Sequence, residues 1–119
     1  MKRHAIGIAA ALALLCQQDM AVADPKRDIV SANYVMPGCW ELVSGSHREL
    51  GLQGLCSGIV GMMFNFEQLH PGTCFPDGSN VEQAIRVVIR YIDRQPERMH
   101  ESFVELALEA MREAWPCRR

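Results

Sequence analysis

The chain has 119 residues, of which 22% are charged, and its formal net charge is −2. A chain of this length can bury one small hydrophobic core, so we expect a single domain. The slightly acidic balance and the lack of a polybasic stretch give no support for nucleic acid binding.

The N-terminus has the layout of a secretory signal peptide. A basic start is followed by an apolar run over residues 5–15 and by an A-x-A cleavage site over residues 21–23. Cys16 raises lipidation as an alternative, but the leucine before it is bulkier than a lipobox accepts. We expect residues 1–23 to be removed on export to the periplasm, which leaves 96 residues with a net charge near −3.

The mature chain is expected to begin with residues 24–32, a charged leader that has little to bury and should be flexible. Ser31 has the character of an N-cap for a first helix. Pro37-Gly38 interrupts that helix, which is therefore kinked or made of two pieces before it resumes over residues 39–43. The helical domain is placed at residues 33–117.

Residues 50–70 form the most apolar stretch of the mature chain. Four polar side chains within it argue against a membrane span. We therefore interpret it as a central helix that its neighbours bury on all sides. Gly54, Gly58 and Gly61 lie three or four residues apart, and each weakens a helix by about 1 kcal/mol relative to alanine. Their spacing predicts the close approach of another backbone.

A third helix is expected after the turn-rich connection at residues 71–78. Ser79 and Glu82 have the spacing of a capping box at its start. Apolar residues then recur at helical spacing up to Ile92. The opposite face carries three arginines, which we interpret as a solvated face in preference to a contact surface for an acidic partner: Arg86, Arg90 and Arg94.

A polar break at residues 94–98 precedes the last helix, expected over residues 100–115. Its apolar side includes Phe103, Leu108 and Trp115. No stretch of the chain alternates in the manner of a strand. The predicted fold is an all-α bundle of about four helices with short connections.

Four cysteines remain after cleavage, and in a short exported chain they indicate two disulfides. Three pairings are possible. Cys39 and Cys56 lie at comparable distances on either side of the first turn, while Cys74 precedes the third helix and Cys117 follows the fourth. This placement favours Cys39–Cys56 and Cys74–Cys117. A zinc site is disfavoured because no C-x-x-C is present and exported thiols do not stay reduced.

Catalytic patterns are missing from the sequence. Ser44-Gly45-Ser46-His47 puts hydroxyls beside a histidine, but neighbours in a tight turn do not face each other as a nucleophile and its base must. There is no G-x-S-x-G elbow, and no strand precedes the central glycines to make a phosphate loop. We expect a binding protein and not an enzyme, with no metal and no cofactor.

Five sequence elements occur in a characteristic order. They are Cys39, GLCSGIVG at residues 54–61, CFPDG at residues 74–78, RYIDRQPERMH at residues 90–100 and AWPC at residues 114–117. Together they resemble the Rap/Tai-type immunity proteins of the type VI secretion system, and the resemblance covers residues 33–117.

That resemblance implies a periplasmic, disulfide-linked helical protein that forms a homodimer. Such proteins neutralise a toxin, a peptidoglycan amidase effector, by occupying its catalytic cleft. The alternative is a periplasmic stress chaperone or an accessory binding protein without a cognate toxin, which should expose apolar surface at low pH.

A protein that plugs a cleft needs a protruding segment on a rigid scaffold. Residues 94–100, between the third and fourth helices, are the first candidate, and residues 44–49 are the second. The partner-binding residues predicted in the first candidate are Arg94, Gln95, Glu97, Arg98 and His100.

Overall fold

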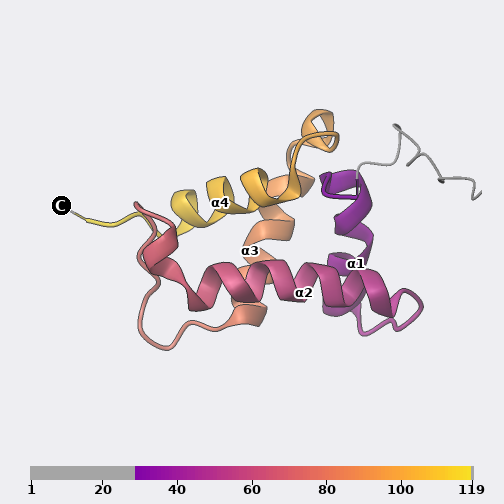
Figure 1. Cartoon of the computed structure of the whole chain (residues 1–119), viewed down its shortest axis with the longest axis horizontal. Helices are drawn as coiled ribbons and strands as arrows, with labels where there is room; N and C mark the ends of the chain where they lie inside the picture. The colour runs from indigo at the N-terminus through magenta and orange to yellow at the C-terminus, as the bar shows by residue number, and fades with distance from the viewer. Residues whose placement is uncertain (1–28, 119) are drawn as a thin grey trace, which may run out of the picture.

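The computed structural model describes residues 29–118, and the predicted signal peptide lies outside this range. Within it the chain is all-α, with four α-helices, two short 3₁₀ turns and no strand (Figure 1), so the predicted fold class is confirmed. The elements are α1 (Ala32–Ser44), α2 (Leu50–Asn65), η1 (Glu67–Leu69), α3 (Val81–Asp93), η2 (Pro96–Arg98) and α4 (Phe103–Ala114).

Helix α1 is tied at its start to the beginning of α4. The backbone N–H of Ala32 donates to the carbonyl of Glu101 at 2.9 Å, and that of Phe103 donates to Val30 at 2.8 Å. Ser31 takes the N-cap position predicted for it, in an extended conformation, and is buried. The folded unit therefore reaches back into the last residues of the predicted leader.

Pro37 lies inside α1, which runs on through it as a single helix of 13 residues. Of the two predicted alternatives, a kinked helix or two separate pieces, the second was therefore wrong. A proline within a helix deprives the carbonyl four residues earlier of its donor. Here that residue is Asn33, which is exposed, so water can satisfy the carbonyl.

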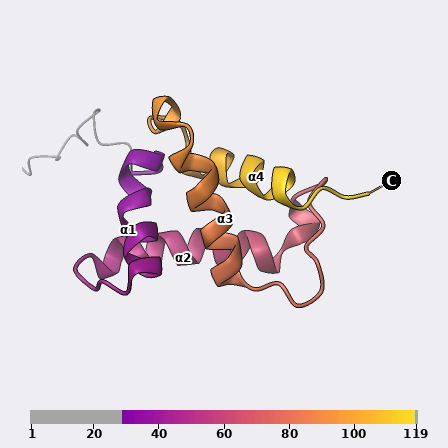
Figure 2. The ribbon, with the colours of Figure 1, turned by 180° about the vertical axis from the view of Figure 1, so that it is seen from behind.

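Helix α2 is buried along one side only, contrary to the prediction that its neighbours surround it. Its inner side is formed by four residues, Gln53, Cys56, Val60 and Met63. In both views α1 stands steeply across its N-terminal half, and α3 and α4 lie on the same side (Figures 1 and 2). Three helices cannot enclose a fourth, so the outer side stays open. The helix also ends at Asn65, five residues earlier than expected, and a 3₁₀ turn follows.

The close backbone approach predicted at the glycines of α2 occurs in a different helix. Within the described part of the chain, nothing apart from the adjacent residues and the backbone of α2 itself lies within 4 Å of a Cβ built on Gly54 or Gly58. A Cβ on Gly38 of α1 would instead collide with the carbonyl of Leu52 and lie 2.7 Å from the amide nitrogen of Gln53. Gly38 thus allows the backbones of α1 and α2 to touch where the helices cross.

The core lies between the four helices and is filled mostly by aliphatic and sulfur-containing side chains. Beside the C-terminal ends of α2 and α4, three aromatic side chains extend the core. Their ring centroids lie 4.6 Å apart for Phe64 and Phe75 and 5.2 Å apart for Phe75 and Trp115. The largest fully buried side chains are Phe103, Met36, Met63, Ile92, Leu106 and Met111.

The predicted capping box at the start of α3 was wrong by one residue. The N-cap is Asn80, whose side chain accepts from the backbone N–H of Gln83 at 2.9 Å. Ser79 turns back instead and donates to the carbonyl of Pro76 at 2.7 Å. Asparagine is as good an N-cap as serine, so the local preference does not separate the two positions.

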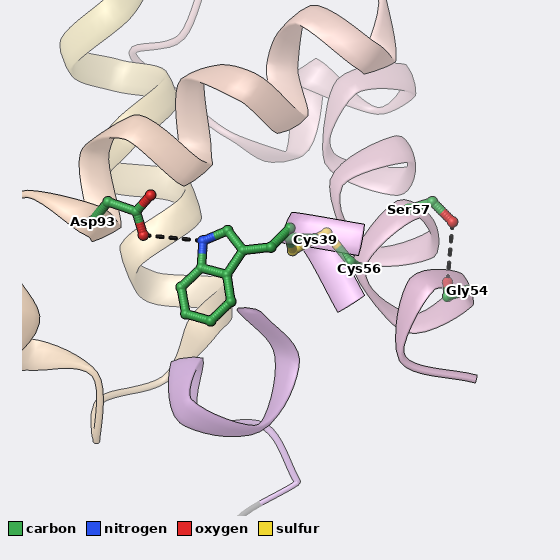
Figure 3. Close-up of a disulfide and its surroundings, with 6 residues drawn as sticks. Cys39, Gly54, Cys56, Ser57 and Asp93 are labelled. Atoms are coloured by element: carbon green, nitrogen blue, oxygen red, sulfur yellow. Dashed lines mark hydrogen bonds between the residues drawn. A yellow bond between two sulfur atoms is a disulfide. The ribbon is translucent and has the colours of Figure 1, made fainter. Parts of the chain in front are cut away.

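Both predicted disulfides are confirmed. Cys39–Cys56 joins α1 to α2, and both residues are fully buried (Figure 3). Cys74–Cys117 joins the loop before α3 to the segment after α4, and both of its residues are exposed. The backbone N–H of Cys74 donates to Trp115 at 2.9 Å, which aligns the two segments beside the second bridge.

Candidate functional site

The first predicted inhibitory segment connects α3 to α4 and contains the turn η2. It projects beyond both helices at one edge of the molecule (Figure 1). The backbone N–H of Asn33 donates to the carbonyl of Met99 at 2.7 Å, so the start of α1 supports the segment from a third direction. A protruding loop with three helical supports has the shape that a cleft-plugging inhibitor requires.

Arg98 fastens this loop to α4. Its guanidinium donates from Nε and Nη2 to the carboxylate of Glu101, with a shortest distance of 2.7 Å. It also donates to both oxygens of Glu109, at 2.7 and 3.1 Å. Tyr91 of α3 donates its hydroxyl to the same Glu109 carboxylate at 2.8 Å. Two carboxylates and one arginine therefore connect the loop, α3 and α4.

The hydrogen bonds between opposite charges in this network lower the pKa values of its two glutamates and raise the pKa of its arginine. Hydrogen bonds from Arg98 hold the pKa of Glu101 below the usual glutamate range. The same arginine, followed by the Tyr91 hydroxyl, lowers the pKa of Glu109. Both carboxylates in turn raise the pKa of Arg98. All three groups are ionised at neutral pH, so the network is intact there.

Of the five predicted partner-binding residues, Arg94, Gln95 and Arg98 pair with other residues of the protein, whereas Glu97 and His100 have no such partner among the described residues. Arg98 is engaged internally, with its side chain only 25% exposed, and it also donates to the side-chain oxygen of Gln95 at 3.1 Å. Arg94 pairs with Glu113 at 3.1 Å on the surface. Glu97 and His100 are exposed and make no side-chain hydrogen bond within residues 29–118. Of the five predicted residues, these two are the exposed ones whose side chains make no such bond.

The second predicted segment, residues 44–49, is anchored in a similar way. One carboxylate oxygen of Glu41 accepts from the backbone N–H of Glu49 and from the side chain of Gln53, both at 2.8 Å. Gln53 also donates to the carbonyl of Ser46 at 2.9 Å, which satisfies this buried amide. The backbone hydrogen bond from Glu49 is the main reason that the pKa of Glu41 is lowered.

The two candidate segments lie at opposite ends of α1. A helix of 13 residues spans about 20 Å at 1.5 Å per residue. One narrow protrusion cannot include both segments, so they are separate candidates.

The sequence did not identify the carboxylates that anchor the two segments, Glu41, Glu101 and Glu109. The three-residue spacing of Arg98 and Glu101 is a local signal for an ion pair. No local signal connects Arg98 to Glu109, because they are 11 residues apart and meet only through the packing of the loop. Glu41 and Gln53 lie on different helices and meet for the same reason.

The predicted arginine face of α3 borders an open hollow of about 630 Å³ beside the end of α1. Next to it the indole N–H of Trp40 donates to Asp93 at 3.1 Å, which links α1 to the end of α3 (Figure 3). The residues around the hollow are Val43, Gln83, Arg86, Val87, Ile89, Arg90, Asp93 and Arg94.

Across residues 29–118, no three histidine, cysteine, aspartate or glutamate side chains are gathered as a metal site would require. No helix in the same range is long and apolar enough to cross a membrane. Fold and site together define a small helical protein that is cross-linked by two disulfides and has two surface loops held in place by hydrogen bonds.

The comparison with protein families agrees with that class. The model of the family described as Rap1a immunity proteins matches residues 9–117, and the chain belongs to this family. The family implies a non-enzymatic inhibitor that binds an effector toxin. Comparison with curated proteins and with solved structures gives no match.

Proposed function

We propose that this protein is a periplasmic immunity protein of the type VI secretion system that blocks a peptidoglycan amidase effector by covering its active site. The observation that carries the proposal is the family match over residues 9–117. The two disulfides support an oxidising compartment such as the periplasm.

The segment between α3 and α4 is the proposed inhibitory element. Glu97 and His100 are exposed at its surface, while Arg98 beneath them is held by Glu101 and Glu109. Because the loop is already ordered, little conformational entropy is lost when it enters a cleft. The outward side chains supply contacts, and the inward arginine supplies rigidity.

The test needs a candidate effector, an amidase-like protein to be sought in the reading frames beside the gene for this chain, with peptidoglycan fragments as its substrate. The purified immunity protein is expected to abolish hydrolysis, and the double variant Glu97→Ala/His100→Ala is expected to weaken inhibition at least about tenfold. The matched control is His47→Ala/Arg48→Ala in the second segment, which should inhibit normally. Equal inhibition by both variants would remove the loop from the mechanism, and a loss confined to the control would assign it to residues 44–49.

We also propose that the homodimer forms through the outer side of α2. No charged side chain occurs from Leu50 to Phe66, and both of these residues are exposed together with Met62. Gly54 lies on the side of α2 away from the buried disulfide (Figure 3), and a Cβ built there would meet no neighbouring element within residues 29–118. An exposed apolar strip of this kind is typical of a contact surface.

Light scattering after size exclusion tests the dimer. Met62→Glu is expected to give a monomer, because it places a charge in an apolar contact, whereas Ala114→Glu on exposed α4 surface should leave the dimer unchanged. The same strip would serve the alternative, a stress chaperone. A chaperone should bind the dye ANS when the pH is lowered, whereas a dimeric immunity protein that covers the strip should stay dark.

A further inference from the structure

The open hollow beside α3, called the groove from here on, has an apolar floor and a basic rim. Val43 comes from the end of α1, and Val87 comes from α3; both are partly buried against the core. Arg86, Arg90 and Arg94 follow one another along the rim at one-turn intervals. The groove ends at Arg94, where the proposed inhibitory loop begins.

The charge of this rim is opposite to that of the rest of the molecule. Residues 29–118 contain seven arginines, no lysine and eleven acidic residues, a formal balance of −4. Three of the seven arginines border the groove, and Asp93 is the one carboxylate among its lining residues. The groove is therefore a local basic site on an acidic protein.

The rim arginines remain available to an incoming carboxylate. Arg90 has no ion-pair partner within the described residues. Arg86 pairs with Glu82 at 2.9 Å, but the two side chains are 57% and 73% exposed. Arg94 and Glu113 are similarly exposed. Exposed pairs of this kind contribute about 0–1 kcal/mol, so a partner can displace them at little cost.

We propose that this groove binds an acidic segment of a partner protein, with an aliphatic side chain on the Val43–Val87 floor and carboxylates paired with Arg86, Arg90 and Arg94. Guanidinium groups bind carboxylates in a two-pronged geometry that a point charge cannot reproduce. Identifying the partner as the effector rests on the proposed function. In that case the acidic segment lies beside the cleft that the loop enters.

The first experiment tests the groove without the effector. The ¹⁵N-labelled chain is titrated with a short acetylated peptide of Glu-Glu-Leu repeats, and with the same peptide carrying Gln in place of Glu. Backbone shifts are expected around Val43, Val87 and Arg90 with the acidic peptide only. Arg90→Glu should weaken binding at least about tenfold, and Arg112→Glu on exposed α4 should bind normally.

Three results would overturn the proposal. One is equal shifts with both peptides, and another is equal binding by Arg90→Glu and Arg112→Glu. The third is tighter binding of a single-stranded oligonucleotide than of the acidic peptide, which would make the site a phosphate-binding one. Both variants change exposed residues, and thermal melts that match the parent chain show that each is folded.

The second experiment uses the effector and separates the two proposals. Arg90→Glu should lower the association rate at least about tenfold and flatten its dependence on salt, because charges at a rim act mainly on association. If the effector is inhibited but its association with Arg90→Glu is unchanged, the groove proposal fails and the immunity function stands. If no effector is bound while the acidic peptide still occupies the groove, the immunity function fails and the groove stands.

Discussion

The two pairs of helices in this protein are joined by different physical means. Where α1 crosses α2, backbone touches backbone at Gly38 and a buried disulfide fixes the crossing. Where α3 meets α4, the apolar contact is supplemented by the charged network around Arg98, and the second disulfide lies exposed at the far end. The α1–α2 contact depends on the absence of a side chain at Gly38, whereas the α3–α4 contact depends partly on the charges of Arg98 and its two glutamates. The proposed inhibitory loop belongs to the α3–α4 contact.

The largest effect is expected at the α1–α2 crossing. Gly38→Val should destabilise the protein by more than about 4 kcal/mol, because the new atoms would overlap the Leu52 backbone, which cannot move without separating the helices. Urea denaturation monitored by circular dichroism measures the loss. A valine tolerated at Gly38 without loss of stability would show that the helices do not touch there.

The disulfides rank next. On chain-entropy grounds, Cys74→Ser/Cys117→Ser should cost about 4 kcal/mol and Cys39→Ala/Cys56→Ala about 3 kcal/mol, because Cys74–Cys117 closes the longer loop. Reduction should follow exposure instead, so a mild reductant should open the exposed bridge first. Alkylation of the released thiols followed by mass spectrometry gives the order. Earlier release of Cys39 and Cys56 would contradict their burial.

The charged network should make the α3–α4 side sensitive to acid. The folded pKa values of Glu101 and Glu109 lie below their unfolded values, so their contribution to stability is present above the ordinary glutamate pKa of about 4.3 and is lost as the pH falls through the folded values. Arg98→Met should lower the melting temperature at pH 7.

Acidification sharpens the same comparison. The difference in melting temperature between the parent chain and Arg98→Met should shrink below about pH 4, because protonation disables the network in the parent as well. Arg112→Met, on the exposed side of α4, is the control and should track the parent chain. A difference that stays constant with pH would show that Arg98 acts through packing alone.

The smallest effect is expected on the outer side of α2. Gly54→Ala should stabilise the monomer by about 0.5–1 kcal/mol, because alanine is the better helix former and its Cβ meets nothing within the described chain. A side chain is therefore expected to raise stability at Gly54 and to lower it at Gly38, which is the clearest contrast between the two positions. If the dimer packs closely on this surface, the same substitution should raise the dissociation constant while the monomer gains stability.

The sequence by itself determined the four helices and both disulfides. Apolar spacing defines a helix within a few turns, and the places of Cys74 and Cys117 at the ends of their helices follow from chain order. It also identified the link between α3 and α4 as an exposed segment, whose role as the inhibitory loop remains a prediction.

Tertiary structure decided which surfaces meet. Helical spacing shows that one side of α2 is rich in glycine, but it does not say whether a neighbour covers that side, and here the close contact fell to Gly38. The hydrogen bonds from Arg98 to Glu109 and from Gln53 to Glu41 could not be predicted from the sequence either. Local patterns record the preference of a residue for water or for the core, whereas the identity of a distant partner depends on how whole helices pack.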